Sequence, residues 1–151
     1  MASPASNKPI IVVDTREQRP YSFTDDRVGS VVNTALPAGD YSLQGYETRI
    51  AIERKSLADY VSTVVHAQDR FSRELSILRS YPRAWIVVEA SMDDVLQGRY
   101  ESEVKPQALF AMTAALQVIY GIEVQFAFDR PTARAWVEEL LVQYWKSQQK
   151  K

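Results

Sequence analysis

The sequence has 151 residues, of which 46% are hydrophobic and 25% charged, a composition typical of one soluble globular domain. It contains no cysteine and a single histidine, His66, which excludes disulfides, zinc–thiolate sites, cysteine nucleophiles and polyhistidine metal sites. The formal net charge of −1 argues mildly against a general nucleic-acid binder. No apolar run approaches a membrane span or a signal peptide, so we expect a cytoplasmic protein without membrane contact.

The first element in chain order is a strand. Residues 10–14 (IIVVD) form a continuous apolar run that ends in Asp14, a pattern typical of a central strand with the acid at its exposed end. The polar residues 15–30 predict a loop, and residues 31–36 can form a short strand. We expect a disordered tail at residues 1–9, one domain at 10–146 and a basic tail at 147–151.

Two further strands predict a hairpin. They span residues 40–43 (DYSL) and 48–55 (TRIAIERK), with Gly45-Tyr46 at the tip of the turn. A turn centred there places Asp40 opposite Ala51, because cross-strand partners keep a constant sum of residue numbers. The prediction depends on this register, since a slip of one residue would move Asp40 to the other face of the ribbon.

The hairpin gathers charged side chains on one face. Side chains alternate between the two faces of a strand, so Glu53 and Lys55 share the face of Ala51 and therefore of Asp40. Glu53 is then a diagonal neighbour of Asp40, close enough for both carboxylates to bind one ion. Arg54 points the other way. The alternative interpretation is a surface hairpin with a solvated Glu–Lys pair.

Two carboxylates beside a lysine suit metal-dependent phosphodiester chemistry. Oxygen ligands favour hard cations, so Asp40, Glu53 and the backbone carbonyl of Arg54 predict a Mg²⁺ or Mn²⁺ site. Such an ion makes a bound water more acidic and offsets charge that builds on a phosphate. Lys55 supplies donors that can hold the water or a phosphate oxygen, and Asp14 can reach the ion directly or through water.

The rest of the chain alternates helices and strands. Ser56 opens a helix in the form of a capping box that includes Asp59. Apolar spacing then predicts a helix at 69–80, a strand at 84–88, a short helix within 91–98, a helix at 106–121, a strand at 124–128 and a final helix that begins near Pro131. This alternation predicts a three-layer α/β domain, and the hairpin makes its central sheet mixed.

Residues 52–59 (IERKSLAD), preceded by Gly39-Asp40, resemble the I/V-E-R-K-x-x-x-D signature of the XPF-type nucleases. The opening strand and loop, Val13-Asp14-Thr15-Arg16-Glu17, are similar to the same family's V-D-x-R-E. The segment from Arg70 to Leu75 and the strand that ends at Glu89 are also similar. The resemblance implies a restriction-endonuclease-like fold with a central mixed sheet flanked by helices. It also implies magnesium-dependent cutting of branched or flapped DNA.

The resemblance adds Asp59 to the expected catalytic set of Asp14, Asp40, Glu53 and Lys55, although Asp59 also suits a simple helix cap. Glu17 and Glu89 are weaker candidates near strand ends. We expect Arg54 to pair with an acid beneath the sheet, with Asp59 as one option, or to brace the motif. The arginines expected to contact DNA phosphates are Arg16, Arg54, Arg70 and Arg73, although Arg16, Arg70 and Arg73 equally suit a solvated surface.

We therefore expect a structure-specific DNA endonuclease of repair or recombination that cuts near branches, flaps or single-strand junctions by hydrolysis. The resemblance also implies a homodimer through the two C-terminal helices, whose aromatic band could instead complete the core. A separate targeting protein is a further expected partner. Two alternatives stay open: a non-catalytic DNA-binding partner with a nuclease fold, and a restriction enzyme or junction resolvase of the same wider fold.

Overall fold

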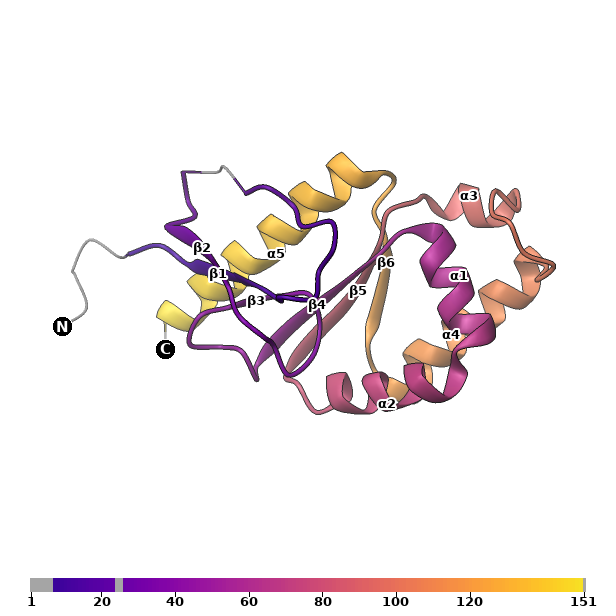
Figure 1. Cartoon of the computed structure of the whole chain (residues 1–151), viewed down its shortest axis with the longest axis horizontal. Coiled ribbons are helices and arrows are strands. Elements are labelled where there is room, and N and C mark those ends of the chain that lie inside the picture. Colours follow the sequence, from indigo (N-terminus) through magenta and orange to yellow (C-terminus); the bar gives the residue numbers. More distant parts are fainter. Residues whose placement is uncertain (1–6, 24–25, 151) are drawn as a thin grey trace.

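The computed structural model describes residues 7–23 and 26–150, which form six strands and five helices. In chain order these elements are β1 (Ile10–Val13), β2 (Ser30–Asn33), β3 (Tyr41–Leu43), β4 (Ile50–Lys55), α1 (Leu57–His66), α2 (Gln68–Arg79), β5 (Arg83–Val88), α3 (Met92–Leu96), α4 (Pro106–Tyr120), β6 (Glu123–Phe126) and α5 (Arg130–Gln149). Figure 1 shows them around one central sheet.

The sheet is mixed, as the hairpin predicted. Its strand order is β2-β1-β3-β4-β5-β6. The strands β4, β5 and β6 run parallel, whereas β3 is antiparallel to both of its neighbours, β1 and β4. Lys55, Val88 and Phe126 are level with one another, so the carboxyl ends of the three parallel strands meet at one edge of the sheet.

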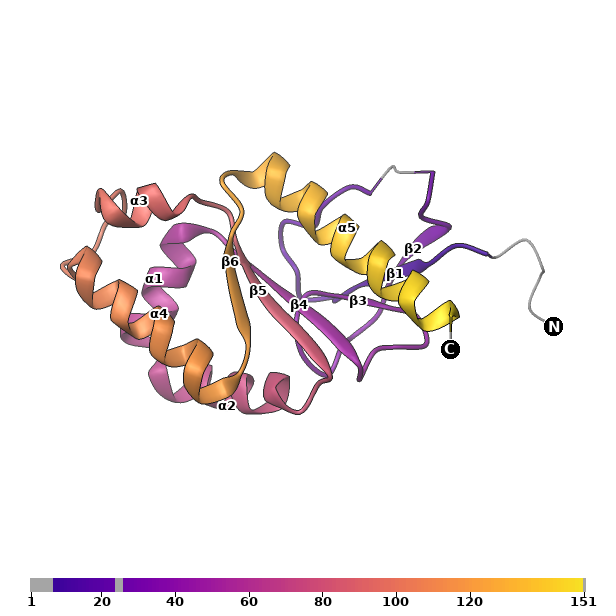
Figure 2. The same ribbon diagram turned by 180° about the vertical axis from the view of Figure 1, so that it is seen from behind.

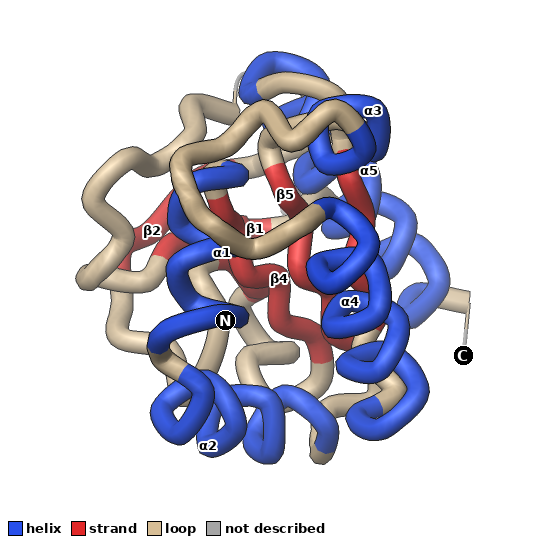
Figure 3. The backbone as a smooth tube through the Cα atoms, turned by 90° about the vertical axis from the view of Figure 1, so that its right-hand side faces the viewer, coloured by secondary structure: helices blue, strands red, loops and turns tan. Residues whose placement is uncertain are grey.

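Helices cover both faces of the sheet, which confirms the three-layer α/β architecture. The long helix α5 crosses one face, as the reverse view shows (Figure 2). The helices α1, α2 and α4 pack on the other face, where the tube view places α1 and α4 in front of the strands and α2 below them (Figure 3). Each layer of helices encloses its own hydrophobic core against the sheet.

The alternation of side chains along β4 explains the two cores. Ile50 and Ile52 are fully buried in the core beneath α5, whereas Ala51 belongs to the core beneath α1, α2 and α4. Burial of one large aliphatic side chain contributes roughly 1.5–3 kcal/mol, so this alternation holds the strand in register. It also decides that Glu53 and Lys55 emerge on the α1–α2 side and Arg54 on the α5 side.

Several element boundaries differ from the predicted ones. The strand β1 ends at Val13, one residue before Asp14, and β2 covers residues 30–33 rather than 31–36. The helix α5 continues to Gln149, so most of the segment expected to be a basic tail from residue 147 is the last turn of that helix. Across residues 7–23 and 26–150, none of the helices has the length and hydropathy that crossing a bilayer requires.

Candidate active site

The pairing of β3 with β4 places the two expected metal ligands directly opposite each other. Tyr41 pairs with Ile52, and the Asp40 N–H donates to the Ile52 carbonyl at 2.8 Å, so Asp40 faces Glu53. The expected register, with Asp40 opposite Ala51, is wrong by two residues. Two successive turns connect the strands, closed by hydrogen bonds from Tyr46 to Leu43 and from Arg49 to Tyr46. A shift of two residues preserves the face, so the carboxylates still share it.

Gly39 allows this arrangement. Its φ of 77° lies in the left-handed region, which residues with a Cβ rarely adopt. A Cβ atom at this position would also lie 3.2 Å from both the Ala51 Cβ and the Ile52 carbonyl oxygen. The glycine therefore lets the chain enter β3 close against β4, with Asp40 as the next residue.

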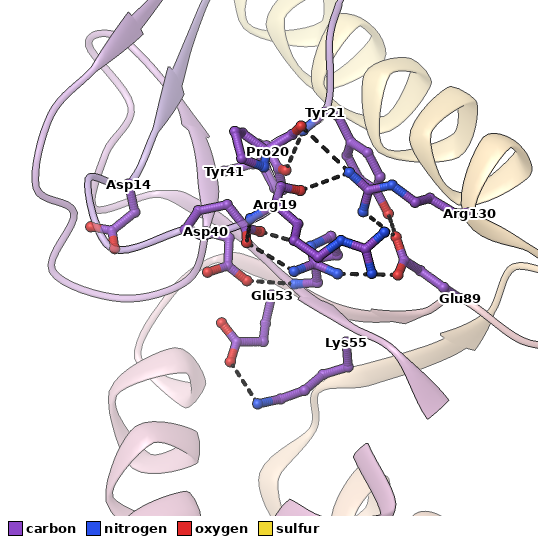
Figure 4. Close-up of polar contacts among 12 residues, drawn as sticks. Asp14, Arg19, Pro20, Tyr21, Asp40, Tyr41, Glu53, Lys55, Glu89 and Arg130 are labelled. Carbon is purple, nitrogen blue, oxygen red and sulfur yellow. Dashed lines mark hydrogen bonds and ion pairs between the residues drawn. The ribbon is translucent and has the colours of Figure 1, made fainter. Parts of the chain in front are cut away.

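Both carboxyl groups resist ionisation, chiefly because they are removed from water. Burial raises the pKa of Asp40 to about 6, against the opposing effect of the Arg54 N–H, which donates to Asp40 Oδ2 at 2.7 Å. Burial and the charge of Asp40 raise the pKa of Glu53 well above its usual value. Figure 4 shows the two carboxylates turned toward each other, with Lys55 Nζ 3.3 Å from Glu53 Oε2.

The structure adds Glu74, a residue that the sequence did not single out as part of the site. This side chain of α2 contacts the Glu53 carboxyl and further raises its pKa. Its only sequence signal is its place in the segment from Arg70 to Leu75, which resembles the nuclease family. Helical periodicity cannot show that α2 returns to β4, so the contact follows only from the tertiary packing.

This site fits a hard divalent cation. Asp40 and Glu53 present oxygen donors, and the carbonyl of Arg54 lies between Glu53 and Lys55 in the same strand. Within residues 7–23 and 26–150, no group of three or more acidic, histidine or cysteine side chains is arranged to hold a metal. Mg²⁺ is commonly held by one or two carboxylates, with water and substrate phosphate as further ligands. A cation between Asp40 and Glu53 would favour the ionised form of both carboxyl groups and so offset the burial that raises their pKa values.

Asp14 lies beside Asp40, where its N–H donates to the Asp40 carbonyl at 2.9 Å, but its carboxylate is held by other groups. Its carboxylate accepts two hydrogen bonds from the Arg16 side chain, at 2.9 and 3.1 Å, and one from the Leu36 N–H at 2.8 Å. Figure 4 shows Asp14 to one side of Asp40 and Glu53. Burial would raise the pKa of Asp14, but these donors hold it below its usual value. Its observed role is to fix Arg16, whose side chain is 71% exposed.

Arg54 points away from the carboxylates, as predicted, but its partners are not Asp59. Its guanidinium donates to Glu17 at 2.8 and 2.9 Å and to Glu89 at 3.1 Å. The Arg54 side chain is 8% exposed, and both acids are buried with it. The prediction that Arg54 contacts DNA is therefore wrong, because its guanidinium group binds the two acids on the α5 side of the sheet. Glu17 and Glu89, expected to be weak site candidates, are its internal counter-ions.

The remaining predicted residues lie on the surface around α1 and α2. Asp59 is exposed in the first turn of α1, where its backbone N–H donates to Ser56 Oγ at 3.1 Å. Arg70 and Arg73 are exposed and line one hollow together with His66. The structure thus keeps these two arginines available for a ligand on the same side of the sheet as Asp40 and Glu53.

Comparison with known proteins identifies a family and solved structures that this chain resembles. The model of the ERCC4 domain matches residues 13–140. XPF from Aeropyrum pernix superimposes with a TM-score of 0.65 at 29% sequence identity, over 90% of this chain and 64% of that one. XPF from Aeropyrum pernix in complex with DNA gives a TM-score of 0.66 at 28% identity, over 93% of this chain and 66% of that one. No curated protein sequence is a significant match.

This chain spans just under two thirds of the length of those two XPF chains, so it corresponds to part of each. The family match, in contrast, extends from the last residue of β1 into α5. It therefore includes all of β2 to β6. It also includes Asp40, Glu53 and Lys55, which converge at the edge of the sheet. The chain belongs to the ERCC4 domain family and has the fold of an XPF-type nuclease domain.

Proposed function

We propose that this chain is a divalent-metal-dependent DNA endonuclease domain that hydrolyses a phosphodiester near a branch, flap or single-strand junction, in DNA repair or recombination. The observation that carries the proposal is the direct pairing of Asp40 with Glu53, with Lys55 on the same face of β4. The solved relative that is bound to DNA supports DNA as the substrate class. A DNA substrate also implies that the protein acts inside the cell.

Each residue of the site has a separate role in the proposed hydrolysis. A divalent cation supplies Lewis acidity at the phosphate and lowers the pKa of water. Asp40 and Glu53 would hold that cation, and the Arg54 carbonyl would be a further ligand. Lys55 Nζ donates to the attacking water and orients it in line with the phosphorus–oxygen bond that breaks. The water oxygen bonds to phosphorus as the phosphorus–oxygen bond to the leaving strand end breaks, with no covalent enzyme intermediate. The proton of the water passes to solvent, and the leaving oxygen takes a proton from solvent. Arg16, Arg70 and Arg73 bind neighbouring phosphates.

Two alternative functions make different demands on the same residues. A non-catalytic DNA-binding partner needs no carboxylate pair, yet here Asp40 and Glu53 are present and lie opposite each other, with Glu53 buried and Asp40 half-buried. A restriction enzyme or junction resolvase shares the wider fold, but the family match favours the XPF group. The retained carboxylate pair therefore favours catalysis over binding alone.

A cleavage panel tests the proposal. The purified chain is incubated with labelled duplex, nicked, flapped, forked and four-way DNA, with Mg²⁺, with Mn²⁺ or with a chelator. We expect metal-dependent cutting near the junctions of flapped or forked DNA. Binding without cutting would instead support the partner module, and symmetric cutting of a fixed duplex sequence would support a restriction enzyme. A stimulating protein from the same source would identify the separate targeting partner.

The surface around β6 and the two C-terminal helices suits a second copy of this chain. The exposed apolar side chains there are Phe110, Val118 and Ile119 of α4, Trp136 of α5, and Phe128 in the connection between β6 and α5. Phe128 also has a φ of 71°, a region that bulky residues rarely adopt. Exposed apolar groups of this size commonly mark an interface.

The homodimer makes a direct prediction. Val118→Glu and Trp136→Glu should each weaken dimerisation by about 2 kcal/mol or more, because a buried carboxylate would replace an apolar anchor. Analytical ultracentrifugation across a concentration series measures the change. Val31→Glu is the matched control, since Val31 is 41% exposed on β2, the edge strand at the opposite end of the sheet. A wild-type chain that stays monomeric at high concentration would refute this part of the proposal.

A further inference from the structure

Arg130, the first residue of α5, joins three parts of the chain that lie far apart in sequence. Its Nη1 donates to Glu89 Oε2 at 3.0 Å, and its Nη2 donates to the backbone carbonyls of Arg19 at 2.8 Å and Pro20 at 3.4 Å. The guanidinium also stacks over the Tyr21 ring, 4.6 Å from its centroid. Figure 4 shows this side chain reaching from α5 to the loop and to the end of β5.

Glu89 connects Arg130 to Arg54. The Glu89 carboxylate is 5% exposed and accepts hydrogen bonds from Arg54 at 3.1 Å, from Arg130 at 3.0 Å and from the Tyr21 hydroxyl at 2.6 Å. Together with Glu17, which Arg54 also binds, the cluster contains two acids and two arginines. Each buried carboxylate therefore has a cationic partner, and removal of Arg130 leaves the cluster with one excess negative charge.

The cluster leads directly to the candidate active site. Arg54 holds Glu17 and Glu89 with its side chain, while its backbone N–H donates to Asp40 Oδ2 at 2.7 Å. The backbone position of Arg54 thus sets the distance between Asp40, which directly precedes β3, and the two functional side chains next to Arg54 in β4, Glu53 and Lys55. Any shift of Arg54 toward a different partner would move this backbone.

We propose that Arg130 is a positioning residue for the nuclease site, an inference that rests on the proposed function. It pins the irregular loop of residues 15–20 through the carbonyls of Arg19 and Pro20, and this loop carries Glu17 to Arg54. It also neutralises Glu89, so that Arg54 keeps its two hydrogen bonds to Glu17 and its single one to Glu89. Without Arg130, Glu89 draws Arg54 toward itself and the loop that presents Glu17 loses its anchor.

An alternative role for Arg130 is a contact with DNA phosphate. The side chain is 31% exposed, but its donors already serve one buried carboxylate and two carbonyls. It lies on the α5 face of the sheet, opposite the face of Asp40 and Glu53. Positioning therefore predicts a loss in the catalytic rate, whereas DNA contact predicts a loss in substrate affinity.

The test compares Arg130→Met, Arg130→Lys and the matched control Arg99→Met, which removes an exposed arginine paired with Asp93 and Asp94. For R130M we expect kcat to fall roughly ten- to a hundredfold with KM for flapped DNA unchanged, because displacement of about 1 Å at a reacting centre costs this much. R130K keeps one charged contact and should retain an intermediate kcat. R99M should cleave like the wild type.

Amide hydrogen exchange gives a readout that does not require cleavage. In R130M the Arg54 amide should exchange at least tenfold faster than in the wild type, while R99M leaves it unchanged. The inference is overturned if R130M keeps the wild-type kcat and the wild-type exchange at Arg54, or if its loss appears in KM and DNA affinity. If the wild type does not cleave DNA, the proposed function fails, and the Arg54 exchange still decides whether Arg130 positions the strand. Should R130M not fold, R130K carries the same two measurements.

Discussion

Replacement of Asp40 by asparagine should abolish DNA cleavage and at the same time stabilise the metal-free protein. Asparagine keeps an oxygen that can accept the Arg54 N–H, which now binds Asp40 Oδ2 at 2.7 Å. It removes the negative charge that a divalent cation needs and that raises the pKa of the neighbouring Glu53. The substitution lowers activity but raises stability, because the negative charge of Asp40 is needed for metal binding and is unfavourable in the folded, metal-free protein. Such a trade is expected where a site is built for function rather than for stability.

The pKa of Asp40 sets the size and pH range of the stability effect. Folding raises this pKa from 3.8 to about 6, so between these values the folded state binds more protons than the unfolded state. Stability therefore falls as pH rises through this window, and the ionised group costs about 3 kcal/mol above it. The Asp40→Asn protein lacks this loss, so its advantage should be absent near pH 4 and largest above pH 6.

Urea unfolding at pH 4.5, 6 and 7.5 in the presence of a chelator measures this difference, and the cleavage panel with Mg²⁺ measures activity. Added Mg²⁺ should narrow the stability gap, because it binds only the folded wild type. Asp93→Asn is the matched control, since Asp93 is an exposed acid paired with Arg99 at the surface. An Asp40→Asn protein that still cuts DNA, or that is less stable than the wild type at pH 7.5 without metal, would contradict the metal site.

The parts of the site that the sequence predicts are those set by local periodicity. Alternation along residues 50–55 assigns Glu53 and Lys55 to one face and Arg54 to the other. A shift of the register by two residues leaves these faces unchanged. The exact pairing of Asp40 with Glu53 was predicted wrongly, because two successive turns end the hairpin where the sequence predicted one turn centred on Gly45-Tyr46. The three-layer fold likewise follows from buried strands that alternate with amphipathic helices.

The contacts that the sequence does not predict join residues far apart along the chain. Arg130 and Glu89 are 41 positions apart, and Arg54 and Glu17 are 37 positions apart. Arginines at helix starts and acids at strand ends are usually solvated in proteins. The residue type therefore does not reveal whether such a side chain has a buried partner. Asp14 illustrates the opposite case, because its hydrogen-bond partner Arg16 is only two residues away in the sequence.

Replacement of Arg54 by methionine should be the most destabilising single change in the cluster, by about 3–5 kcal/mol, because it leaves a buried acid without its cation. Burial alone would raise the pKa of Glu17, but the hydrogen bonds from Arg54 and from the Arg19 N–H hold it below its usual value. This carboxylate therefore contributes stability above its ordinary pKa and loses it as pH falls. The deficit of Arg54→Met should accordingly be largest near neutral pH and shrink below about pH 4.

A second substitution decides whether charge balance is the cause. In Arg54→Met/Glu17→Gln the remaining charges, Glu89 and Arg130, form a neutral pair at 3.0 Å. Urea unfolding of both single variants and the double variant forms a double-mutant cycle, and we expect the double variant to recover at least 1 kcal/mol relative to Arg54→Met. If Arg54 instead contacted DNA, Glu17→Gln would restore nothing, and Arg54→Met would reduce the salt dependence of DNA binding. Equal salt dependence, together with a recovered stability, would assign Arg54 to the interior, where it holds the two strands of the metal site in place.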